Sequence, residues 1–128
     1  MRRIRVVFVG PRALSDVIRH LFRGLPQFEF VGSLRDLKSL ARQVGRLLPE
    51  LIIASVKPVK MGICAAAAAI KRSSPFSRLI LICPPTVLSI DARKYGADAC
   101  LDEEKLVRRL VPAASALSIS PTFSFSGN

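Results

Sequence analysis

The feature that most constrains the fold of this chain is a regular alternation of short apolar runs with segments of helical periodicity. The apolar runs predict five strands, at residues 4–9, 28–31, 51–54, 79–82 and 99–101. The run at 51–54 is apolar at every position, as expected for a strand that helices cover on both faces. A helical pattern follows each run, and this order is typical of parallel strands joined by helices. The sequence therefore predicts an α/β domain built on a doubly wound, five-stranded parallel sheet.

Three of the predicted helices have clear ends. The first begins near Ala13 and ends at the Gly-Leu-Pro of residues 24–26, and Gly32 is expected to close the strand that follows it. The second begins at Asp36, a good N-cap residue, and ends before Pro49. The last begins at Asp102 and runs to about Leu117. Two shorter helices are expected at 64–71 and 87–95.

Apolar side chains three and four positions apart are expected to face the core. They are Leu14, Val17, Ile18, Leu21 and Phe22 in the first helix, Leu37, Leu40, Ala41, Val44 and Leu48 in the second, and Leu106, Leu110, Val111, Ala114 and Leu117 in the last. The strands and helices fill residues 1–117, which we expect to form one domain. The Ser-, Phe- and Pro-rich residues 118–128 are expected to be a linker or a disordered tail.

Composition excludes several classes of protein. Half of the 128 residues are hydrophobic and the mean hydropathy is +0.36, which excludes a disordered body. No apolar run reaches the roughly 18 residues of a membrane span, and the N-terminus enters a strand pattern without a signal peptide, so we expect a cytoplasmic protein without membrane contact. The cysteines Cys64, Cys83 and Cys100 form no CxxC or Cys/His cluster, so neither a zinc site nor a disulfide framework is expected.

The charge is strongly positive and unevenly distributed. Twenty basic residues against nine acidic ones give a net charge of +11, which favours an acidic or nucleic-acid partner. Residues 1–60 carry a net charge of +8, whereas residues 91–104 carry −3. The molecule is therefore expected to be electrically polar from end to end.

In the order and spacing of its segments, the chain resembles the receiver domains of bacterial two-component response regulators. The segments that carry the resemblance are 4–9, 31–32, 49–53, 77–82 and 95–101, and the match covers residues 4 to about 117. The resemblance implies the flavodoxin-like (CheY-like) strand order 2-1-3-4-5. The chain looks most similar to receivers that precede a helix-turn-helix output domain, which implies a DNA-binding domain after Asn128.

The resemblance also shows what the chain lacks. The acidic pair that binds magnesium in the family falls on Gly10 and Pro11, neither of which has a side-chain oxygen, although a hard cation needs oxygen ligands. The aspartate that accepts the phosphoryl group falls on Ser55. We therefore expect no aspartyl phosphorylation, no magnesium, no other cofactor and no enzymatic activity.

The family's remaining functional positions are also substituted. The hydroxyl that follows the phosphoryl oxygen falls on Cys83, the lysine that neutralises the phosphate falls on Glu103, and the aromatic switch residue falls on Cys100. Two interpretations of the charges at this edge stay open. Arg12, Lys57 and Lys60 could form a built-in ion pair with Glu103, or the acids of residues 102–104 could simply cap the last helix.

Other chemistry at these positions carries weaker signals. Ser55 could be modified by a serine kinase, and Cys83 with Cys100 could form a redox switch, but a tolerated loop serine and buried cysteines explain the same residues. The Gly10-Pro11-Arg12 start of the first helix could bind a small anion or a nucleotide. Direct nucleic-acid binding is a third alternative, carried by the basic stripes Arg12, Arg19, Arg23 and Arg35, Lys38, Arg42, Arg46.

The expected function is that of an atypical receiver-like domain that acts through protein–protein contacts without phosphorylation. The family meets its partners and its own copies through the fourth helix, the fifth strand and the last helix. In this chain that face carries mixed charges, which suit a polar or self-complementary interface. Its residues are Arg93, Lys94, Tyr95, Asp98, Lys105, Arg108 and Arg109.

Overall fold

The computed structural model describes residues 3–55, 68, 70–83 and 97–119, and the following account is restricted to them. Five strands form one all-parallel sheet of order β2-β1-β3-β4-β5, as predicted. The strands are β1 (Ile4–Val9), β2 (Phe28–Leu34), β3 (Leu51–Ser55), β4 (Arg78–Cys83) and β5 (Ala99–Asp102). The described helices are α1 (Arg12–Phe22), α2 (Leu37–Leu47), the 3-10 turn η3 (Glu103–Lys105) and α4 (Leu106–Ile119).

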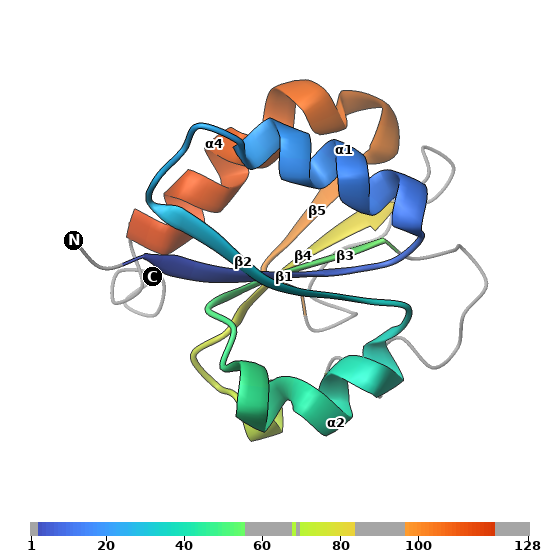
Figure 1. Ribbon diagram of the computed structural model, residues 1–128, viewed down its shortest axis with the longest axis vertical. Helices are drawn as coiled ribbons and strands as arrows, with labels where there is room; N and C mark the ends of the chain where they lie inside the picture. Colours follow the sequence, from blue (N-terminus) through green and yellow to red (C-terminus); the bar gives the residue numbers. More distant parts are fainter. Residues whose placement is uncertain (1–2, 56–67, 69, 84–96, 120–128) are drawn as a thin grey trace.

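Helices cover both faces of the sheet, with α1 and α4 on one face and α2 on the other (Figure 1). Alternate residues of each strand supply the two cores, because successive side chains of a strand point to opposite faces. In β1, Val6 and Phe8 pack with α1 and α4, whereas Val7 and Val9 pack with α2. All six residues of β1 were predicted correctly, and β3 is fully buried from Leu51 to Ala54.

The phase of α1 differs from the prediction. Ile18 and Phe22 are buried as expected, but Val17 is 43% exposed and Ser15 takes a buried position instead. Ser15 can be buried because its hydroxyl shares a hydrogen bond with the hydroxyl of Ser33 on β2, at 2.8 Å between the oxygens. The hydrogen bond to Ser33 on β2 therefore allows Ser15, and not Val17, to face the sheet.

Strand β2 is longer than predicted. Gly32 does not close it but lies inside it, where the pairing with β1 shifts between Val6 and Val7. Val6 pairs with Phe30 and Val7 with Gly32, so Val31 is the extra residue of a bulge. The glycine marks this irregularity rather than the end of the strand.

The end of α2 is also different. Asp36 caps the helix as predicted, since its carboxylate accepts a 2.8 Å hydrogen bond from the Ser39 N–H. Leu48, predicted to be buried, is 61% exposed because the chain leaves the helix there in the left-handed conformation, with φ of 49°. Leu47 packs against the core in its place.

The remaining helices agree in part. The predicted 64–71 helix continues to Ser73 in the described residues 68 and 70–73, while its start and the predicted 87–95 helix lie outside the described residues. Asp102 ends β5 and caps the turn η3, so the last α-helix begins four residues later than predicted. Leu106, Leu110 and Ala114 are buried against the sheet, as expected. None of the helices in the described ranges combines the length and the apolar character that crossing a bilayer requires.

Candidate functional site

The carboxyl edge of the sheet brings the predicted site positions together. Ala54 pairs with Val9, Ser55 with Ile82, and Cys83 with Asp102. The residues that end or follow these strands therefore lie side by side at one edge: Gly10, Ser55, Cys83 and Glu103. In this class of fold, that edge is where ligands bind.

Gly10 leaves no space for a side chain. Its φ is +150°, a conformation that residues other than glycine rarely adopt. A Cβ atom placed there would lie 2.8 Å from Cζ of Phe8 and 3.0 Å from Cβ of Ser55. The Phe8 ring is fully buried between α1, α4 and the sheet. Position 10 therefore lacks a carboxylate and, in addition, its environment is closed to one.

The start of α1 offers few groups to an anion. Pro11 is the N-cap residue and makes no side-chain cap, and its carbonyl accepts the 3.0 Å hydrogen bond from the Ser15 N–H. The Gly10 N–H is used within the sheet edge, where it donates to the Leu34 carbonyl at 2.8 Å. Arg12 is exposed. The cationic side chain of Arg12 is thus open to solvent, and the Gly10 N–H is already engaged in a hydrogen bond.

Ser55 and the cysteines occupy different environments. Ser55 is half-buried at the end of β3 beside Gly10. Cys100 pairs with Leu81, two residues before Cys83 on β4, and its half-buried side chain packs against the core on the α2 side. The side chain of Cys83 lies outside the described part of the molecule. The backbone register alone therefore places the two cysteines on neighbouring strands, offset by two residues.

The acids after β5 act as helix caps. The Asp102 carboxylate accepts a 2.9 Å hydrogen bond from the Glu104 N–H, and Glu103 is exposed in the same turn. No ion pair joins Arg12 to Glu103, both of which are described. Lys57 and Lys60 lie outside the described residues. Of the two interpretations of these charges, the capping role is the one that the geometry of Asp102 supports.

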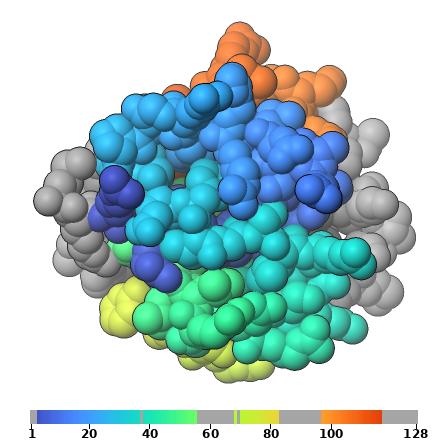
Figure 2. Space-filling view, viewed as in Figure 1, coloured from blue at the N-terminus to red at the C-terminus, as the bar shows by residue number. Residues whose placement is uncertain are grey.

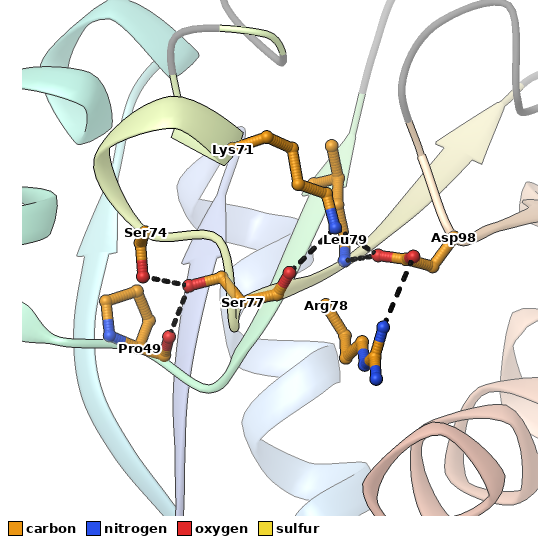
Figure 3. A network of polar contacts seen from close by, with 7 residues as sticks. All are labelled: Pro49, Lys71, Ser74, Ser77, Arg78, Leu79 and Asp98. Carbon is orange, nitrogen blue, oxygen red and sulfur yellow. Dashed lines mark hydrogen bonds and ion pairs between the residues drawn. The ribbon is translucent and has the colours of Figure 1, made fainter. Parts of the chain in front are cut away.

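The predicted interface residues separate into two groups. Lys105, Arg108 and Arg109 are exposed on η3 and α4. The Asp98 carboxylate is instead engaged in contacts within the chain, whereas Arg93, Lys94 and Tyr95 lie outside the described residues. One oxygen of Asp98 lies 2.7 Å from the Lys71 ammonium and 2.7 Å from the Leu79 nitrogen (Figure 3).

This network at the amino edge of β4 was not predicted from the sequence. Lys71 also donates to the Ser77 carbonyl, and the fully buried Ser77 hydroxyl donates to the Pro49 carbonyl and contacts the Ser74 hydroxyl (Figure 3). The signal available in the sequence was the pair of serines flanking Pro75 and Phe76 directly before a strand. The partners in this network include Pro49 and Asp98, which are distant along the chain, so the two serines alone do not predict it.

Among the described residues, no cluster of three His, Cys, Asp or Glu side chains could hold a metal ion. The pKa of the exposed Asp36 carboxyl is lowered, mainly by the hydrogen bonds from Ser39, and the nearby Arg42 and Lys38 add to this. This shift belongs to the cap of α2 and not to the carboxyl edge of β3.

No protein-family model and no curated protein sequence matches the chain. Similar solved structures exist. They include the response regulator domain of CheB from Thermotoga maritima, with a TM-score of 0.74 and 21% identity over 90% of this chain and 96% of that one. A LuxR-family two-component response regulator from Aurantimonas sp. SI85-9A1 gives a TM-score of 0.76 and 17% identity over 90% of this chain and 84% of that one.

The response regulator RcsB from Salmonella typhimurium gives a TM-score of 0.76 and 18% identity over 94% of this chain and 64% of that one. At these identities, the likeness concerns the fold. The strand order, the all-parallel sheet and the helices on both faces agree with it. The chain therefore has the fold of response regulator receiver domains.

Proposed function

We propose that this chain is an atypical receiver-like domain of a bacterial signalling or transcriptional regulator, which acts in the cytoplasm through protein–protein contacts and without phosphorylation. The observation that carries the proposal is the carboxyl edge of the sheet. A working receiver needs carboxylates after β1 and β3. Here, Gly10 and Ser55 stand there, and a side chain built at Gly10 would meet the Phe8 ring and Cβ of Ser55. Gly10 and Ser55 therefore offer no side-chain carboxylate to magnesium or to a phosphoryl group.

One feature supports protein binding, and a second supports a DNA-binding output domain. Lys105, Arg108 and Arg109 form an exposed cationic group on η3 and α4 that can meet an acidic surface or an acidic part of a second copy. The similar RcsB chain is a response regulator that interacts with DNA, and the present chain spans 64% of it. We propose that the domain at 1–117 precedes a DNA-binding output domain, with 118–128 as the linker.

The test is treatment of the chain with acetyl phosphate and magnesium, followed by intact mass and by light scattering. We expect no gain in mass and no change in oligomeric state, while a receiver domain that carries the full acidic set gains one phosphoryl group in parallel. Ser55→Ala is the matched variant. A magnesium-dependent gain in mass that Ser55→Ala abolishes would overturn the proposal.

A nucleic-acid role has one observation in its favour, the exposure of both basic stripes. Arg12, Arg19 and Arg23 are exposed on α1, and Arg35, Lys38, Arg42 and Arg46 are exposed on or next to α2. The two helices lie in opposite layers, however, so one straight duplex cannot contact both stripes at once. Duplex DNA is the probe, and binding at physiological salt, weakened by further salt, is the result that would favour this role. Thermal shifts with phosphate and nucleotides test the small-anion alternative.

A further inference from the structure

Two large apolar side chains are exposed at the amino edge of the sheet, opposite the carboxyl edge. Phe76 is 89% exposed in the turn before β4, and Leu48 is 61% exposed between α2 and β3. The other phenylalanines of the described residues are buried or half-buried. Neighbouring exposed apolar side chains of this size are typical of interaction sites.

A buried hydrogen bond joins the loop before β3 to the loop before β4. The Ser77 hydroxyl, which has no exposure, donates to the Pro49 carbonyl at 2.5 Å (Figure 3). The Arg78 N–H donates to the Glu50 carbonyl at 2.9 Å, and the β3–β4 ladder begins there with Leu51 opposite Arg78. In Figure 2, the yellow segment before β4 lies against the green end of α2. Leu48 and Phe76 therefore belong to one continuous surface.

The backbone of Leu48 adds a second, independent observation. Its φ of 49° and ψ of 54° are those of a left-handed helix cap, where glycine or asparagine is usual. A leucine at this position strains the backbone and gains little burial in return. Backbone strain at residues other than glycine is found most often at functional sites, such as those that clamp a ligand.

The charges around this surface favour an acidic partner. Arg46 is exposed two residues before Leu48, Arg72 is exposed at the end of the helical residues 70–73, and Arg3 is exposed before β1. The acids at the same edge are partly buried or already paired: Glu50 is half-buried, and the Asp98 carboxylate pairs with the Lys71 ammonium and accepts a hydrogen bond from the Leu79 N–H. The net charge of +11 disfavours a second copy as the occupant, because most of its surface charge has the same sign as these arginines. A single exposed aromatic ring beside an aliphatic leucine is a poor stacking platform for nucleic acid.

We infer that the surface of Leu48, Phe76, Arg46 and Arg72 docks an acidic segment of a partner protein that inserts apolar side chains beside Leu48 and Phe76. The arginines attract the segment and orient it, and the two apolar side chains provide the desolvated centre of the contact. This surface is independent of the lost phosphorylation chemistry because it lies at the opposite edge of the sheet.

The probe is a displayed library of random peptides, selected on the immobilised full chain and counter-selected on the Leu48→Ser/Phe76→Ser variant. We expect the surviving peptides to be rich in Asp and Glu and to contain Leu, Phe or Trp. A synthesised survivor should lose at least about tenfold in affinity on the double variant, and added salt should weaken its binding. Val17→Ser, which removes an exposed apolar side chain on α1, is the matched control and should leave the affinity unchanged.

Leu48→Gly separates docking from folding. Glycine suits the left-handed cap, so this variant should unfold at the same or a higher urea concentration while its peptide affinity falls. The inference is overturned if Leu48→Gly keeps full affinity, or if the survivors are not acidic. It is also overturned if no peptide survives and the same two residues instead control self-association, binding to oligo-dT, or binding to phosphatidylserine vesicles.

Discussion

At the scale of single residues, Gly10 occupies a position at the carboxyl edge that has no space for a side chain. We expect Gly10→Ala to destabilise the chain by about 1–3 kcal/mol, because its Cβ would overlap the Phe8 ring and its φ would be strained. Urea unfolding measures the change. Gly45→Ala is the matched control: its Cβ would meet nothing within 4 Å in exposed α2, so a gain of about 0.5–1 kcal/mol is expected.

The Phe8 ring is the stated cause of this cost, so the effect must depend on it. In a Phe8→Leu background, Gly10→Ala should cost less than in the wild type, because the ring carbon at 2.8 Å is removed. If the two costs are equal, the ring does not close the site and only the backbone conformation matters.

Asp36 makes the stability of α2 dependent on pH. Its carboxyl pKa is lowered below 3.8 by the hydrogen bonds from Ser39, so the ionised form stabilises the folded state. This contribution is complete above the unfolded pKa and is lost as the pH falls through the lower folded pKa. Asp36→Asn keeps an oxygen for the cap but does not titrate. The wild type should therefore exceed the variant in urea midpoint at about pH 7, and the difference should shrink at about pH 3.

Both chains share every other carboxyl group, so the difference between them isolates Asp36. A difference that stays constant or grows on acidification would show that the charge of Asp36 does not stabilise the cap.

At the scale of helices and strands, the sequence predicted the elements well and their ends poorly. The five strands followed from apolar runs, since burial on both faces of a parallel sheet leaves an apolar signal along the strand, and the order of the strands followed from the resemblance. Val17 and Leu48 were assigned to the core because spacing along one helix does not contain the Ser15–Ser33 contact or the left-handed turn. These errors arise from partners on other elements, which periodicity cannot show.

The candidate site divides in the same way. The resemblance led us to expect, residue by residue, that Gly10 and Ser55 stand where the family has carboxylates. It could not show that a side chain at position 10 would collide with the Phe8 ring, because this depends on a φ of +150° and on the position of that ring. The hydrogen bond from Ser77 to Pro49 joins residues 28 positions apart, so the sequence could not show it either.

Pro112 gives a prediction for α4. It lies inside the helix and is exposed, so it removes a backbone hydrogen bond without packing in the core. We expect Pro112→Ala to stabilise the chain by about 1–3 kcal/mol, which is below the full interior cost because the unfolded chain also gains freedom. Thermal unfolding measures this change.

Pro26→Ala is the control for Pro112, with the opposite sign. Pro26 is exposed in the turn after α1, where it stiffens the unfolded chain, so its loss should destabilise by about 0.4–1 kcal/mol. A destabilising Pro112→Ala would mean that the proline shapes α4 in a way that the sheet requires.

At the scale of the whole molecule, the two edges of the sheet have different roles. The carboxyl edge carries the substituted site at Gly10, Ser55 and Glu103, while the amino edge holds the Asp98 network and the exposed Leu48 and Phe76. Side-chain hydrogen bonds join the three loops of the amino edge, which restrains them relative to one another. Under the proposed function, the domain acts as a scaffold whose docking surfaces do not depend on phosphorylation.

The net charge of +11 sets the last prediction, because like charges spread over a small domain repel one another in the folded state. Raising sodium chloride from about 0.01 M to about 0.1 M shortens the screening length from about 30 Å to about 10 Å, so the unfolding temperature should rise. A variant with Arg3, Arg35 and Arg109 changed to glutamine removes three exposed positive charges. It should be more stable than the wild type at low salt and respond less to added salt. Equal responses in the two chains would mean that salt acts on hydration of the surface and that self-repulsion does not limit the stability of the fold.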